Sequence, residues 1–136
     1  MLYTYNDLKM HCANRVDIFR AQYVNFFEIL EDLYNSEEIK KVYIKNLFNS
    51  NDVQTFFFFE GKIVKMTISD LLFNIEEIKY GIVKKQLSTS RKFERDVQLK
   101  LTFDDSSEII FNNCKDSNPD FQWDYGQDIK ELYKFL

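Results

Sequence analysis

The sequence has few of the residues that build disulfides, metal sites and tight turns. Its 136 residues include three glycines, one proline, two cysteines and one histidine. Cys12, Cys114 and His11 match no spacing of metal ligands, so we expect no metal and no cofactor. Turns must instead be built from Asn, Asp and Ser, and a chain this poor in glycine and proline is not expected to be disordered.

Signals for export or membrane insertion are also missing. No basic region followed by an apolar stretch stands at the start, and no apolar run is long enough to cross a membrane. We therefore expect a cytoplasmic protein with reduced cysteines. The formal net charge of −4 makes nucleic acid an unexpected partner. The length fits a single domain, residues 1–136.

Aromatic residues are abundant, and four of them are consecutive. The chain holds 14 Phe and 8 Tyr, so aromatic rings must fill much of the interior. Four phenylalanines end the segment Val53–Phe59, and Glu60-Gly61 separates that segment from Lys62–Ile68. Two apolar segments joined by two residues that include glycine are typical of a β-hairpin.

The register of this hairpin divides the phenylalanine run between two faces. With Glu60-Gly61 as the turn, Phe57 and Phe59 share one face, which belongs to a core. The other face carries an apolar cluster near the turn, which consists of Phe56, Phe58 and Ile63. We expect the N-terminal helices to cover this cluster. If those helices pack on the opposite face instead, the cluster becomes a surface for a partner.

Residues 1–50 are predicted to be helical. Apolar side chains recur at spacings of three and four: Val16, Phe19, Tyr23, Phe26, Leu30 and Leu33. This first helix could begin near Asn6 or near Asn14. A second helix is predicted over Ile39–Leu47, so the two helices form either a kinked helix or an antiparallel hairpin.

Residues 53–136 are predicted to form a sheet and a final helix. Alternating apolar residues predict strands over 53–59, 62–68, 71–75, 77–86, 97–103 and 108–111. An amphipathic helix is expected over Tyr125–Leu136, capped by Asp120 or Asp124. The predicted fold class is α+β. An N-terminal helix or helical hairpin packs on an antiparallel meander of five to six strands, with the C-terminal helix beside or across the sheet.

No catalytic arrangement is evident in the sequence. His11 and Cys12 are neighbours in a predicted helix and point about 100° apart, so a dyad would need His11 to meet Cys114 through the fold. Asp116–Asp120 has the spacing of the first ligands of a calcium loop, but Phe121 stands where that loop needs glycine. We therefore expect no catalytic residue and no enzyme, with a small hydrolase or transferase as an alternative.

One segment, Lys84–Arg95, concentrates positive charge. It contains one acidic residue and five basic ones, which are Lys84, Lys85, Arg91, Lys92 and Arg95. The segment therefore carries a net charge of +4, and the rest of the chain carries −8. Such a cluster could bind phosphate, anionic lipid or an acidic protein surface, or its lysines could simply protect a sheet edge.

The last hairpin, Val97–Phe111, is followed by Trp123 and the helix Tyr125–Leu136. In this order of elements, residues 53–136 resemble pleckstrin-homology-like domains. The resemblance implies a bent antiparallel sheet closed by the final helix, and a basic loop, Lys84–Arg95, that binds a phosphorylated or protein ligand. The chain also resembles small uncharacterised bacterial proteins.

These observations predict an interaction protein without enzymatic activity. We expect it to bind a protein partner through a sheet surface or through the basic segment, as a small acidic immunity protein or inhibitor would. The alternative is a pleckstrin-homology-like module that binds an anion or a lipid headgroup. The candidate partner-binding residues are Lys84, Lys85, Arg91, Lys92, Arg95, Phe56, Phe58 and Ile63.

Overall fold

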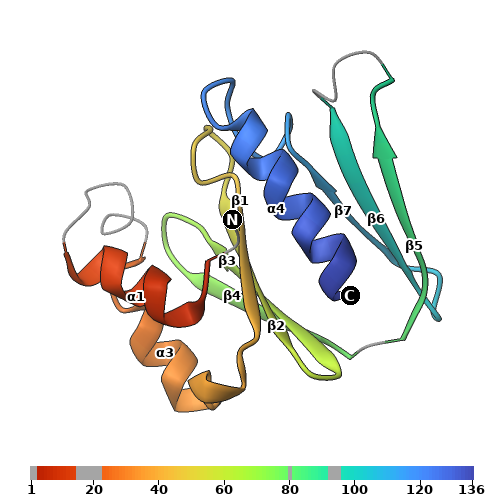
Figure 1. Cartoon of the computed structure of the whole chain (residues 1–136). Coiled ribbons are helices and arrows are strands. Elements are labelled where there is room, and N and C mark those ends of the chain that lie inside the picture. The colour runs from red at the N-terminus through yellow and green to blue at the C-terminus, as the bar shows by residue number, and fades with distance from the viewer. Residues whose placement is uncertain (1–2, 15–22, 80, 92–95) are drawn as a thin grey trace. The chain divides into compact units, whose positions relative to one another are not determined.

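The computed structural model describes residues 3–14, 23–79, 81–91 and 96–136. Within these residues the chain forms two compact units, each built around one antiparallel sheet (Figure 1). The four-stranded unit comprises described residues of 3–44 and 52–78, with strand order β1-β2-β3-β4. The three-stranded unit comprises described residues of 45–51 and 79–136, with strand order β5-β6-β7.

The elements follow one another in the order helices, strands, helix. They are α1 (Tyr5–Ala13), α3 (Phe26–Leu33), the 3-10 helix η1 (Ser36–Glu38), β1 (Lys41–Lys45), β2 (Val53–Phe59), β3 (Lys62–Ile68), β4 (Phe73–Lys79), β5 (Ile82–Thr89), β6 (Val97–Phe103), β7 (Glu108–Asn112) and α4 (Gln122–Phe135). The α+β class is confirmed. The single sheet of five to six strands is wrong, because the described strands number seven and form two sheets. The prediction of one domain stays a prediction.

The hairpin β2–β3 has the predicted register. Phe58 pairs with Ile63 and Phe57 with Val64, so Glu60 and Gly61 form a two-residue turn. Gly61 has φ +80°, a conformation that glycine adopts without the strain of a side chain.

Helices α1 and α3 pack on the face of this hairpin that carries Phe57. The ring of Phe57 lies 6.4 Å from that of Tyr5 in α1 and 5.8 Å from that of Phe26 in α3. On the same face, the hydroxyl groups of Tyr23 and Thr55 share a hydrogen bond of 2.7 Å. The predicted N-terminal cover therefore lies over the Phe57 face and not over the cluster on the other face.

The predicted second helix, Ile39–Leu47, is wrong. Ile39 is the C-cap of η1, and Lys41–Lys45 form strand β1, which lies next to β2 in the sheet. Three successive residues, Val42, Tyr43 and Ile44, are buried, as they are in a strand that is covered on both faces. The apolar residues of this segment also have helical spacing. Its residues favour strands, however, and it pairs with β2, so the segment forms a strand.

The start of α1 agrees with the earlier of the two predicted positions. The Thr4 hydroxyl accepts a hydrogen bond of 3.1 Å from the Asp7 amide, so Thr4 caps the helix. Asn14, the alternative start, is instead the C-terminal cap. The positions Val16 and Phe19 of the predicted stripe lie outside the described residues. The stripe resumes in α3, where Phe26 and Leu30 are fully buried.

In the three-stranded unit, β6 is the central strand and α4 lies along the sheet (Figure 1). Alternate β6 residues, from Val97 to Phe103, are buried, as the sequence predicted. In α4 the buried residues include Ile129 and Leu132. The predicted caps are wrong, because Phe121 occupies the N-cap position and makes no side-chain cap.

The strands predicted at 71–75 and 77–86 have different bounds in the structure. One strand, β4, covers residues 73–79, and the next, β5, begins at Ile82 in the other sheet. Gly81 stands before β5, where its carbonyl accepts a hydrogen bond of 2.7 Å from the Asp104 amide. A Cβ at this position would lie 2.5 Å from the Asp104 carboxyl group, so a larger residue here would displace that exposed side chain.

Candidate functional site

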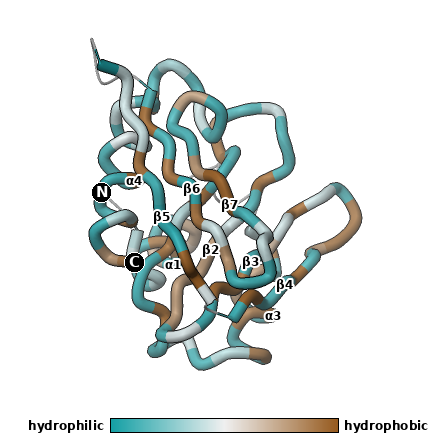
Figure 2. The backbone as a smooth tube through the Cα atoms, turned by 90° about the vertical axis from the view of Figure 1, so that its right-hand side faces the viewer, coloured by the Kyte–Doolittle hydropathy of each residue, from teal (hydrophilic) through white to brown (hydrophobic). Residues whose placement is uncertain are grey.

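Strand β5 forms an exposed edge of the three-stranded sheet. It pairs with β6 on one side, and six of its eight residues are exposed. Val83, which is 65% exposed, is the largest apolar side chain among them. The strand begins with Ile82 and Val83 and is mainly hydrophilic thereafter, as the teal colour along much of β5 in Figure 2 shows. Such an edge presents main-chain donors and acceptors to any chain that can lie beside it.

The basic residues of this strand have different environments. The Lys85 Nζ donates a hydrogen bond of 2.8 Å to the Tyr133 carbonyl and lies 4.5 Å from the centre of the Tyr133 ring. Lys85 therefore binds the carboxyl end of α4, where a positive charge is favourable. Lys84 and Arg91 are exposed, and within the described residues neither forms an ion pair. Lys92 and Arg95 lie outside the described residues.

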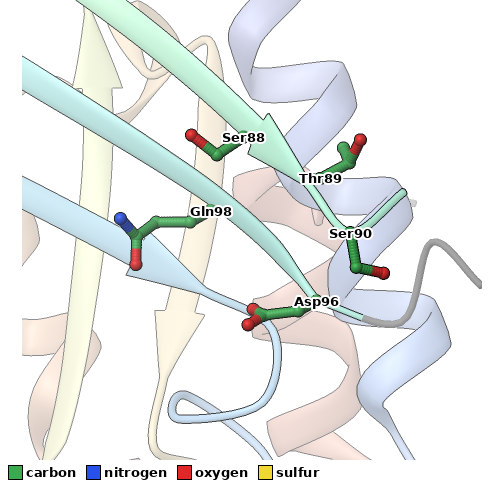
Figure 3. A pocket seen from close by; sticks show the side chains of 5 residues that line it. All are labelled: Ser88, Thr89, Ser90, Asp96 and Gln98. Carbon is green, nitrogen blue, oxygen red and sulfur yellow. The ribbon is translucent and has the colours of Figure 1, made fainter. Parts of the chain in front are cut away.

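A polar cavity of about 270 Å³ lies at the end of β5 and the start of β6. Its lining consists of Ser88, Thr89, Ser90, Asp96 and Gln98 (Figure 3). The Asn112 amide group, from β7, donates to the Asp96 carboxylate at 3.0 Å and to the Gln98 side chain at 3.3 Å. The cavity thus has fixed hydrogen-bonding groups and one carboxylate. That carboxylate disfavours a bound anion.

A second cavity, of about 390 Å³, lies in the four-stranded unit near the hairpin turn. Its lining mixes two carboxylates and two ammonium groups with one ring: Glu38, Glu60, Lys40, Lys62 and Phe59. The Lys62 Nζ lies about 5 Å from the ring centres of Phe59 and Tyr34, at 5.0 and 5.1 Å. The lining has no excess of either charge and therefore indicates no particular ligand.

The phenylalanine cluster is buried. Phe56 is 2% exposed, and Phe58 and Ile63 are fully buried. The structure therefore does not present these three side chains as an aromatic surface. Their burial rules out an exposed patch of these side chains, although α1 and α3 pack on the opposite face of the hairpin, which was the condition set for such a patch.

The thiols have environments opposite to those of catalytic cysteines. Burial raises the pKa of Cys12 to about 11. Burial, and then the negative charge of Asp96, raises the pKa of Cys114. Both groups are therefore protonated near pH 7, whereas a nucleophilic cysteine needs a lowered pKa. His11 packs edge-on against Tyr3, with 5.8 Å between ring centres.

Sequence reasoning missed a buried polar network in the three-stranded unit. Asp116 is only 1% exposed. Its carboxylate accepts a hydrogen bond of 2.9 Å from the main-chain amide of Asn112 and lies 3.5 Å from the Lys45 Nζ. Its carbonyl accepts a further bond of 2.7 Å from the amide of Asn46, which has φ +71°. The residues considered for calcium thus join the 45–51 segment to the loop after β7. Within the described residues, no group of three or more metal-ligating side chains occurs.

The protein is therefore a small α+β protein with an exposed edge strand, β5, and two polar cavities among the described residues. No helix in the described part of the chain is long and apolar enough to cross a membrane. Residues 4–128 match a family described as a protein of unknown function (DUF3908), and the chain belongs to this family. No curated protein and no solved structure matches the chain.

Proposed function

We propose that this chain is a non-enzymatic interaction protein that binds a protein partner through β5 and the basic residues next to it. The observation that carries the proposal is the exposure of β5, whose residues from Lys84 to Gln86 all face solvent. Residues 82–91 include three basic residues and no acidic one, although the whole chain has a net charge of −4. A local positive surface on an acidic protein favours a partner with negative charge.

The basic residues near β5 are not equally available to a partner. Lys85 already binds the Tyr133 carbonyl, so it stabilises α4 and contributes less to a partner. Lys84 and Arg91 are exposed and keep their charges at the surface. They are therefore the described residues on which binding should depend most.

Capture of partners by an immobilised protein from its native cells tests this proposal. The double variant K84E/R91E should lose a partner that the wild type retains, whereas K115E should retain it. Lys115 is a matched control because it is exposed in the same unit, and only its main chain takes part in the described hydrogen bonds. Equal capture by all three proteins would contradict the proposal.

A pleckstrin-homology-like module that binds an anion is the second candidate. In its favour, the hydroxyl groups of Ser88 and Ser90 line a cavity that is next to Arg91 in the chain. Against it, the same cavity contains the Asp96 carboxylate. Titration with inorganic phosphate, followed by NMR of the amides of residues 88–91, separates the two candidates. Saturable shifts that disappear in R91Q would favour the anion.

A further inference from the structure

We propose that β5 binds its partner by strand addition, and that the partner supplies an extended acidic segment. This inference rests on the proposed function and specifies how the same surface would act. In strand addition, main-chain hydrogen bonds provide affinity and alternate side chains provide selectivity. An edge that accepts a strand must be long, regular and accessible.

The edges of the two sheets differ in accessibility. At β1, the Val42 amide donates a hydrogen bond of 3.1 Å to the Tyr3 carbonyl, so another segment already lies at this edge. At β7, the Lys45 Nζ donates to the Ile110 carbonyl at 2.8 Å. At both edges, therefore, at least one main-chain group already forms a hydrogen bond within the protein.

Two edge strands remain, and they differ in charge. Strand β4 carries Glu76 and Glu77, whose carboxylates lie close to Lys65, at 3.8 Å, and Tyr34, at 2.9 Å. Strand β5 carries Lys84 and Lys85 and has no acidic residue. An acidic segment is therefore complementary to β5 and not to β4.

The geometry of β5 suits a strand of about six residues. The pairing with β6 shifts between Ile82 and Lys84 and is regular from Lys84↔Thr102 to Thr89↔Val97. An added strand would place alternate side chains on the face of the sheet that carries Lys84, where a carboxylate would lie across from the ammonium group. The same lysine would repel the β5 edge of a second copy, so the edge favours an acidic partner over self-association.

A synthetic peptide provides a direct test of this inference. The probe is Ac-Thr-Glu-Val-Glu-Val-Glu-Thr-NH2, titrated into the full chain labelled with nitrogen-15. We expect saturable amide shifts centred on residues 82–89 and at least fivefold slower hydrogen exchange in this strand. A peptide with Lys in place of each Glu should bind at least tenfold more weakly, because its charges repel Lys84.

Two further comparisons separate strand addition from simple charge attraction. Methylation of alternate peptide nitrogens removes main-chain donors without changing charge, and it should weaken binding at least tenfold. The variant K84E should weaken binding of the acidic peptide at least fivefold, whereas K115E should leave it unchanged. Equal binding of the methylated peptide, or shifts located outside β5, would overturn strand addition.

The outcomes also distinguish this inference from the proposed function. If K84E/R91E loses the cellular partner but the peptide does not bind β5, strand addition is wrong and the interaction surface stands. If capture and peptide binding are both independent of Lys84, both proposals are wrong. Protection of the β5 amides that rises with protein concentration, without peptide, would show that a second copy occupies the edge and would overturn the acidic partner.

Discussion

At the scale of single residues, Asp116 is a buried carboxylate of the three-stranded unit with two described partners. Its carboxylate is buried and serves both the Asn112 amide and the Lys45 ammonium group. We expect D116A to lower the free energy of unfolding by about 3 kcal/mol, because it leaves the buried main-chain amide of Asn112 without its acceptor and removes the carboxylate beside Lys45. Urea denaturation would measure this change. The control D120A, at an exposed carboxylate, should change stability by no more than about 0.5 kcal/mol.

A second residue-scale prediction concerns pH. Hydrogen bonds from Lys9, at 2.6 Å, and from Tyr5, at 2.8 Å, lower the pKa of Glu31. A carboxylate whose folded pKa lies below its unfolded value stabilises the fold above the unfolded pKa, about 4.3. This contribution is lost as the pH falls through the folded pKa. It should stay below about 1 kcal/mol because the pair is exposed to solvent.

The measurement is an NMR titration of the Glu31 carboxyl group. We expect K9Q to raise its pKa toward the ordinary value, since the strongest donor is removed, whereas K40Q should not change it. A Glu31 pKa that is the same in K9Q and in the wild type would show that Lys9 does not bind this carboxylate in solution.

The thiols allow a third prediction at this scale. Because burial raises the pKa of both cysteines, each should react slowly with iodoacetamide at pH 7, at least tenfold more slowly than a free thiol. Mass spectrometry of C12S and C114S variants would assign the two rates. Rapid alkylation of Cys114 at pH 7 would contradict this prediction and would favour the enzyme alternative.

At the scale of elements, the turn of the β2–β3 hairpin depends on the backbone conformation of Gly61. Gly61 has φ +80°, and a Cβ at this position would meet no atom within 4 Å, so a substitution there changes conformation and not packing. We expect G61A to lower the free energy of unfolding by about 1 kcal/mol, and G61N to lower it less, because Asn tolerates this conformation. Equal stability of the three proteins in urea would contradict a strained turn.

The same hairpin shows which elements could be predicted from the sequence. Its register followed from Glu60-Gly61 as a two-residue turn between two apolar segments, because a turn is a local signal. The helix predicted over Ile39–Leu47 failed because its apolar spacing fits a helix and a strand alike. Pairing of β1 with β2, the next strand along the chain, decided between them.

The candidate site could be predicted only in part, for a similar reason. The charges of Lys84 and Arg91 could be found from composition alone. The hydrogen bond from Lys85 to Tyr133 could not be predicted in this way, because it joins residues 48 positions apart. The burial of Phe56 and Phe58 depends on tertiary packing too, so alternation along the strand showed their common face but not its cover.

At the scale of the whole molecule, an acidic chain presents one basic, exposed edge strand. From the net charge of −4 we expect nonspecific binding to nucleic acid to be weak, and we propose that the positive charge near β5 attracts an acidic surface. Binding that depends on these charges should weaken as salt increases. We expect the association rate with the partner to fall at least fivefold between 50 and 300 mM salt, as stopped-flow measurements would show. A rate independent of salt would argue for an apolar contact.

The central claim is that β5 is the edge at which a partner binds. Hydrogen exchange of the complex purified from native cells, compared with the free protein, tests this claim most directly. Amides of residues 82–89 should become at least fivefold more protected in the complex, while those of β4 should not change. Protection confined to other strands, with β5 exchanging as fast as in the free protein, would contradict it.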